Sequence, residues 1–357
     1  MTTRADLARL RLAAQRIAGP GFDTAAEAVG WLTAVQAQDF PGAVTSVALR
    51  TRSRSRDDVL AALTTGAVVR SWPMRGTLHF VPAEDLPWLL ELAAPRVLKG
   101  AARRQAELHL DEPTLARAGE LAVAALSGRR ELSRAGLLAH WEQAGVSTTG
   151  QRGYHLIWHL AHTGTLCLGP VRDGEQRLVL LSEWAPRVRH PEPDEALGEL
   201  AVRYFRSHGP ATVKDFTRWT KLTAAEVRIA LALARPQLDP VEVDGVEYLM
   251  DPATPGRLAV ASTRRQVRGV VLLPGFDEFM LGYGDRTAAL PAEFADRIVP
   301  GGNGMFRGTV VSDGQVVGTW NRSGKGTGAG RAIQATPLTA FAPAVEKVIP
   351  AVYAALP

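Results

Sequence analysis

The sequence predicts an α+β protein in which helices alternate with short strand hairpins. Before residue 262, apolar residues recur at helical spacing in several segments. Asp-Gly pairs at 173–174, 244–245 and 313–314 separate short extended runs, which is typical of hairpins. From about residue 262 onward the pattern changes to strands, and a helix is expected at 341–355.

Three consecutive segments, residues 1–110, 111–190 and 191–261, repeat one order of elements. Helices are predicted at 5–17, 24–35 and 57–63, then at 114–126, 134–144 and 150–162, and then at 195–207, 212–219 and 223–234. The groups end in extended runs at 76–81, at 166–169 with 177–181, and at 241–243 with 247–249. Helices followed by a two-stranded wing predict three tandem winged-helix modules. The alternative is generic helical packing with incidental hairpins.

Residues 262–357 are predicted to form a small C-terminal β-barrel. Strands are expected at 270–273, 307–312 and 315–320, with a glycine-rich turn at 301–304. The terminal helix would close this module.

The composition is that of a globular protein with a modest positive charge. The 357 residues carry a formal net charge of +5, and both 1–110 and 261–357 have more basic than acidic side chains, which favours an anionic partner. No apolar run approaches the roughly 20 residues of a membrane span, so no membrane association is expected. A single cysteine, Cys167, fits a reducing cytoplasm. We expect a cytoplasmic monomer.

The most informative segment is 35–41, which reads VQAQDFP. Two glutamines two positions apart lie on nearly opposite sides of a regular helix. Pro41 disfavours helical geometry at Phe40 and tends to end a helix. We therefore predict that Gln36 and Gln38 lie in a last helical turn or an irregular segment, where their amides converge. The alternative is a pair of exposed amides near a helix end.

Four further segments accompany this motif: RSWPMRGTLHF at 70–80, LPGFDEFMLGY at 273–283, NGMFRGT at 303–309 and VGTW at 317–320. Together they resemble the AlkZ/YcaQ family of winged-helix DNA glycosylases over nearly the whole chain. The catalytic signature of that family is Gln-x-Gln or Gln-x-Asp. Gln36-Ala37-Gln38 is similar to the Gln-x-Gln branch, which is linked to unhooking alkylated and cross-linked DNA.

The resemblance implies a monofunctional DNA glycosylase for N7- or N3-alkylated purines in double-stranded DNA, and hence a nucleoid-associated protein. Interstrand cross-links and bulky genotoxin adducts are further candidate substrates, in general base excision repair or in antibiotic self-resistance. An alkylated purine is positively charged, so it leaves without general-acid help. A glutamine amide accepts through its carbonyl and donates through its NH2. We therefore predict that Gln36 and Gln38 hold the water that attacks C1′, with no cofactor and no metal.

Other polar residues are candidates for supporting roles. Asp39 is either the carboxylate that Gln-x-Asp relatives use or, as we prefer, a polar helix-end residue. If 75–81 is extended, Arg75 and His79 share one face of a strand, where His79 would support the site or serve a structural role. The predicted DNA contacts are Arg70, Arg75, Gln151, Arg152, Arg264, Arg265, Arg322, Lys325 and Arg331. Solvated helix ends and hairpin tips are the alternative for several of these residues.

Two other functions use the same features. A non-catalytic winged-helix DNA-binding or regulatory protein would share the helices and charges. A small-molecule sensor built on winged helices would show little salt dependence in its DNA affinity.

Overall fold

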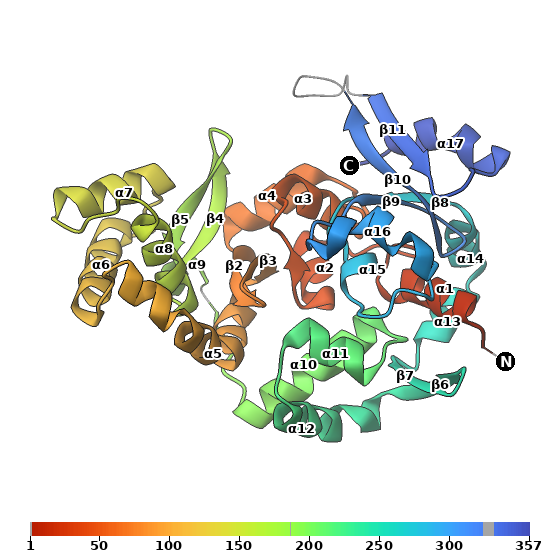
Figure 1. Ribbon diagram of the computed structural model, residues 1–357, viewed down its shortest axis with the longest axis horizontal. Coiled ribbons are helices and arrows are strands. Elements are labelled where there is room, and N and C mark those ends of the chain that lie inside the picture. Colours follow the sequence, from red (N-terminus) through yellow and green to blue (C-terminus); the bar gives the residue numbers. More distant parts are fainter. Residues whose placement is uncertain (1, 186, 324–331) are drawn as a thin grey trace. The chain divides into compact units, whose positions relative to one another are not determined.

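The structure is a computed structural model that describes residues 2–185, 187–323 and 332–357. By its internal contacts the chain divides into unit 1, Met1–Arg56 with Leu197–Pro357, and unit 2, Asp57–Ala196. Both units combine helices with antiparallel sheet (Figure 1). The predicted mixture of helix and sheet is therefore confirmed, while the partition into four consecutive modules stays a prediction.

Unit 2 is built around antiparallel strands in the order β3-β2-β4-β5. Its elements are α4 (Arg56–Thr65), β2 (Val68–Met74), β3 (Thr77–Pro82), α5 (Leu86–Glu107), α6 (Glu112–Leu126), α7 (Arg134–Gln143), α8 (Arg152–His162), β4 (Leu166–Arg172), β5 (Glu175–Leu180) and α9 (Leu181–Trp184). Trp72, Trp141 and Leu156 lie in its apolar core, and the Trp141 indole N–H donates to Ala118 O at 2.9 Å. The helices α6, α7 and α8 thus precede the hairpin β4–β5, in the order expected from the sequence.

The Asp-Gly pairs lie at hairpin tips, as the sequence predicts. The φ angles are 55° and 75° at 173–174, 52° and 74° at 244–245, and 49° and 79° at 313–314. Two successive positive φ angles are the requirement of a type I′ turn, which Asp-Gly meets with little strain. Arg75 and Gly76, with φ of 57° and 68°, connect β2 to β3 in the same way. Arg75 therefore lies in a turn, and the condition under which Arg75 and His79 would share one face of a strand is not met.

Unit 1 contains the two ends of the chain. Its elements are α1 (Arg4–Ala14), α2 (Ala25–Leu32), β1 (Val35–Gln36), α3 (Phe40–Ala48), α10 (Pro193–His208, which begins in unit 2), α11 (Val213–Thr220), α12 (Ala224–Ala234), β6 (Asp239–Val243), β7 (Val246–Met250), α13 (Thr254–Ala259), α14 (Ala261–Arg268), β8 (Val270–Leu273), α15 (Glu278–Leu281), α16 (Ala295–Ile298), β9 (Gly308–Ser312), β10 (Gln315–Ser323), β11 (Ala332–Pro337) and α17 (Pro343–Ala354). Thr24 caps α2 in a capping box with Glu27.

The C-terminal strands form an open sheet in the order β11-β10-β9-β8. In the described part of the chain β8 and β11 are edge strands, so the predicted β-barrel is not supported. The helix α17 packs against this sheet through Ile349, near Trp320 and Val310 (Figure 1). The helix α17 thus covers one face of this sheet and removes it from water, although the strands do not close into a barrel. Arg264 and Arg265, which lie within the predicted barrel 262–357, belong instead to the helix α14.

Candidate active site

The segment that carries Gln36 and Gln38 connects two helices and belongs to neither. Helix α2 ends at Leu32, Gln36 lies on the short strand β1, and α3 begins at Phe40. The segment is therefore irregular and is not the last turn of a helix. Pro41 lies in the first turn of α3, where its missing N–H costs no helical hydrogen bond. The expectation that Pro41 ends a helix is wrong, because it begins one.

The side chain of Gln36 folds back onto the motif. Gln36 is only 5% exposed, and its Oε1 accepts the backbone N–H of Gln38 at 3.3 Å. The side chain of Gln38 is exposed. The structure thus connects the two glutamines through one side chain and one backbone group.

A buried carboxylate holds the backbone of the motif. Glu278 is fully buried, and its Oε1 accepts the Gln36 N–H at 3.3 Å. Its Oε2 accepts the indole N–H of Trp219 at 3.0 Å and lies 3.3 Å from His208 Nε2. Burial of a carboxylate costs several kcal/mol unless donors surround it, so these contacts are needed for the fold. They also fix the position of Gln36.

The preceding residue, Asp277, holds the helix that follows the motif. Its two carboxylate oxygens accept from Arg50 Nη1 at 2.9 Å and Nη2 at 3.0 Å, and Oδ2 accepts from Ser46 Oγ at 2.6 Å. Arg50 and Asp277 are almost completely buried. Ser46 lies on α3, and Arg50 follows that helix closely. Two consecutive acids therefore hold both flanks of the glutamine motif.

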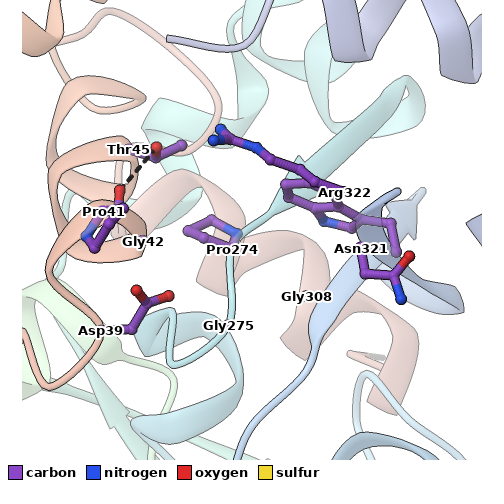
Figure 2. A pocket seen from close by; sticks show the side chains of 10 residues that line it. Asp39, Pro41, Gly42, Thr45, Pro274, Gly275, Gly308, Asn321 and Arg322 are labelled. Carbon is purple, nitrogen blue, oxygen red and sulfur yellow. Dashed lines mark hydrogen bonds between the residues drawn. The ribbon is translucent and has the colours of Figure 1, made fainter. Parts of the chain in front are cut away.

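A pocket of about 240 Å³ lies beside the motif in unit 1. It is lined by Asp39, Pro41, Gly42, Thr45, Pro274, Gly275, Gly308, Trp320, Asn321 and Arg322. In the view of Figure 2 the Asp39 carboxylate and the Arg322 side chain lie at opposite ends, with Pro274 between them. A Cβ atom at Gly42 would lie 2.4 Å from Asp39 Oδ2, so glycine makes room for the carboxylate. The structure thus brings together two of the predicted site residues, Asp39 and Arg322.

Comparisons with known proteins show the family of the chain. A family model described as DNA glycosylase AlkZ-like matches residues 29–354. The chain belongs to this AlkZ-like family. The chain is 30% identical over 311 residues to the interstrand DNA cross-link repair glycosylase of Streptomyces sahachiroi. These residues cover 83% of this chain and 82% of that protein. The solved structure of Streptomyces sahachiroi DNA glycosylase AlkZ matches with a TM-score of 0.80 and 26% identity, over 99% of this chain and 96% of that one.

Family membership decides between the functions that the sequence left open. The AlkZ-like family is one of DNA glycosylases, so the chain is an enzyme of that class. A regulator without catalytic activity and a small-molecule sensor are not supported.

Within unit 2 of the glycosylase, Arg75 and His79 contact each other. Arg75 Nη2 lies 2.9 Å from His79 Nε2, and His79 Nδ1 lies 2.8 Å from Thr77 O. Because a carbonyl only accepts, Nδ1 carries the proton and Nε2 accepts from Arg75. His79 is fully buried, which suits the structural role considered for it. Arg70 on β2 donates to Gln176 Oε1 at 2.8 Å.

Gln151 and Arg152 stand at the start of α8 and are engaged inside unit 2. Gln151 Oε1 accepts from Arg104 Nη2 at 2.7 Å. Arg152 donates to the carbonyl oxygens of Leu108, Ser147 and His109, the last two at 2.9 and 2.8 Å. A guanidinium group with several carbonyl partners stabilises the loops around it. Contact of these residues with DNA stays a prediction.

The remaining predicted contacts lie in unit 1. Arg264 and Arg265 are exposed on α14, whose Thr263 and Val267 face the interior. Arg322 is exposed on β10. Lys325 and Arg331 lie outside the described residues.

No group of three potential metal ligands occurs among the residues that the structure describes. In the same residues no helix is long and apolar enough to cross a membrane.

The sequence reasoning missed the groups that hold the motif: Arg50, His208, Trp219, Asp277 and Glu278. One signal was available. Asp277 and Glu278 stand side by side in the otherwise apolar segment 273–283, and adjacent acids in an apolar run need donors from elsewhere in the fold.

Proposed function

We propose that the chain hydrolyses the N-glycosidic bond of N7- or N3-alkylated purines in double-stranded DNA, as a monofunctional glycosylase. Gln36 and Gln38 position the attacking water. The observation that carries this proposal is the clamped backbone of the motif, in which Glu278 fixes Gln36 while the Gln38 side chain stays at the surface.

The reaction needs a placed water more than a strong acid. As the C1′–N bond breaks, its electron pair moves to the alkylated base and neutralises the positive charge there. The sugar acquires oxocarbenium character, as in glycoside hydrolysis. Water then forms the new C1′–O bond and its proton leaves to solvent, so the products are a neutral base and an abasic site. Fixed amide dipoles lower such a barrier by about 3–4 kcal/mol.

Asp39 is assigned a polar role at the start of α3. It is exposed and occupies the N-cap position without a side-chain capping bond. A carboxylate near a helix N-terminus is favourable by about 0.3–1 kcal/mol, which accounts for its presence without a role as base.

Substrates include bulky adducts and interstrand cross-links in this proposal. The Streptomyces sahachiroi relative is named for repair of interstrand cross-links. A cross-linked base cannot rotate out of the duplex, so an open site serves such substrates better than a deep base-flipping pocket. The groups α6–α8 with β4–β5 and α10–α12 with β6–β7 are the winged-helix modules that would hold the duplex. The setting we propose is a monomer at the bacterial nucleoid, in repair or in self-resistance.

The test is excision from duplexes that carry one defined lesion: N7-methylguanine, N3-methyladenine, a bulky N7 adduct or an N7–N7 cross-link. Heat or alkali converts each abasic product to a strand break. Breaks at the lesion that appear only after this treatment, and in excess of those in duplex treated without enzyme, support a monofunctional glycosylase. Tight binding to all duplexes without breaks would contradict the proposal.

A further inference from the structure

A second pocket, here called the basic pocket, lies on the C-terminal sheet and has a volume of about 380 Å³. It is lined by Arg297, Arg307, Gly308, Thr319, Trp320, Asn321, Gln334, Thr336, Pro337 and Leu338. These residues include two arginines and four neutral polar side chains but no carboxylate. The pocket therefore has a positive charge that its own lining does not neutralise.

The register of the sheet gathers the neutral polar groups on one face. Thr319 pairs with Thr336, and Asn321 pairs with Gln334, across the β10–β11 ladder. Side chains two positions apart point to the same face of a strand, and directly paired residues do so as well. The four side chains thus form a compact patch of donors. Trp320 alternates with them, and its indole N–H donates to Leu273 O at 2.8 Å.

The two arginines are available for a ligand. Arg297 and Arg307 are exposed, and neither side chain has a hydrogen-bond or ion-pair partner within the described ranges. Many other arginines of the chain are paired; Arg9 with Asp313 and Arg235 with Glu247 are examples. A guanidinium group presents a planar fork of donors that matches a phosphate in geometry and charge.

The basic pocket adjoins the pocket beside the glutamine motif. Gly308, Trp320 and Asn321 line both, so they form a shared wall; Figure 2 labels Gly308 and Asn321 opposite Asp39 in the first pocket. A group bound by Arg297 and Arg307 would therefore lie in the pocket next to the one that Asp39 lines. Asp39 is the neighbour of Gln38 in the sequence.

We propose that the basic pocket binds a backbone phosphate close to the damaged nucleotide and so sets the register of the DNA strand at the motif. This inference rests on the proposed function. It adds two residues, Arg297 and Arg307, to those expected to contact DNA. The neutral side chains of Asn321, Gln334 and Thr336 would donate further hydrogen bonds to the phosphodiester oxygens.

The experiment is a double-mutant cycle between the protein and the DNA. Duplexes contain a stable abasic analogue, and single phosphates on either side of it are replaced in turn by neutral methylphosphonate. Affinity is measured for the wild type, for Arg297→Gln with Arg307→Gln, and for Lys347→Gln. Lys347 is exposed on α17, does not line the pocket, and its substitution removes one positive charge.

For the wild type we expect one or two methylphosphonate positions to weaken binding about tenfold, the scale of a hydrogen bond between charged groups. The double variant should bind the all-phosphate duplex less tightly and be insensitive to those positions. The slope of its log affinity against log salt should become shallower by about 0.9 for each phosphate that the variant leaves unneutralised. Lys347→Gln should keep the wild-type pattern, and unchanged thermal midpoints would show that the variants are folded.

The inference is overturned if the double variant keeps the wild-type methylphosphonate pattern. The assay needs no excision, so its result is independent of the proposed activity. A wild type that shows the phosphate pattern but never releases a base would refute the proposed function and leave the basic pocket in place.

Discussion

Glu278 and Gln36 are joined by a hydrogen bond of 3.3 Å between a fully buried carboxylate oxygen and a backbone N–H. The bond links a residue near the middle of the C-terminal half to a motif near the N-terminus. With Asp277 bound to Arg50, it makes the segment 277–278 the support of the proposed active site. A backbone held in this way presents the neighbouring amides at fixed positions, which is the condition for catalysis by preorganised dipoles.

The first prediction concerns Glu278→Gln. The amide keeps the size of the side chain but replaces one acceptor by an NH2 group, which then faces either the Gln36 N–H or the Trp219 indole. We expect the single-turnover excision rate to fall at least about tenfold through the displaced motif. Affinity for a duplex with an abasic analogue should stay within about twofold, because phosphate contacts dominate it.

Asp215→Asn is the matched control for Glu278→Gln. Asp215 is also a buried carboxylate of unit 1, and it accepts from the backbone N–H of Thr212 and of Gly284. Neither of these two partners belongs to the glutamine motif. The substitution should lower the thermal midpoint but keep the excision rate of the folded enzyme. If both variants lose rate in proportion to stability, Glu278 has only a structural role.

The second prediction concerns the buried ion pair. Arg50→Met leaves Asp277 buried without its main donor, at a cost of about 3–5 kcal/mol in unfolding free energy. Arg9→Gln removes a partly exposed pair with Asp313 and should cost at most about 1 kcal/mol. Urea unfolding of both variants measures the difference in unfolding free energy. Equal losses would contradict a stabilising role of the buried Arg50–Asp277 pair.

The local signals in the sequence were reliable where they concern neighbouring residues. Asp-Gly pairs identified three hairpins, because the signal of a two-residue turn acts within a few residues. Pro41 was expected to end a helix, but it lies in the first turn of α3. Proline occurs both after the end and at the start of helices, and only the position of the neighbouring helix distinguishes the two arrangements. The prediction of a C-terminal β-barrel is not supported, for a related reason. Strand patterns do not reveal whether sheet edges meet.

The site was only partly predictable for the same physical reason. Gln36 and Gln38 form a recognisable pattern within three residues. Their supports, Glu278 and Trp219, lie far away in sequence and meet the motif only in the folded chain. Arg152 stands at a helix start, and its guanidinium donates to nearby carbonyl oxygens. Its contact with DNA stays a prediction.

The third prediction is a loss of stability at alkaline pH. Burial raises the pKa of Tyr283 and of Tyr204 above the ordinary value of 10.0. Above that value the unfolded chain loses phenolic protons that the folded chain keeps, so unfolding becomes more favourable as pH rises. Each tyrosine should contribute a slope of about 1.4 kcal/mol per pH unit.

Urea unfolding on both sides of the ordinary tyrosine pKa measures this slope. Tyr283→Phe removes one titrating group and should flatten the slope by about one proton. The variant also loses the Tyr283 hydrogen bond to His208 O, of 2.7 Å, so its stability at neutral pH should be lower. If stability depends on pH with the same slope in Tyr283→Phe as in the wild type, the buried Tyr283 phenol is not the source of that slope.

The fourth prediction separates the two roles considered for Asp39. As a polar residue at the start of α3, Asp39 should tolerate replacement by asparagine, with an excision rate within about threefold of wild type. Loss of a general base costs about 10²–10⁴-fold. Single-turnover rates for Asp39→Asn distinguish these outcomes, and a loss of the larger size would assign the water-activating role to the carboxylate.

The central claim is tested most directly by the single-turnover excision rate of Gln38→Ala on a duplex with one N7-methylguanine. The Gln38 side chain is exposed, so its removal should leave the fold intact. We predict a loss of about 10²-fold or more, as for other preorganised donors, while Lys347→Gln on the surface of α17 keeps the wild-type rate. A folded Gln38→Ala enzyme that excises at the wild-type rate would contradict the role of the glutamine motif.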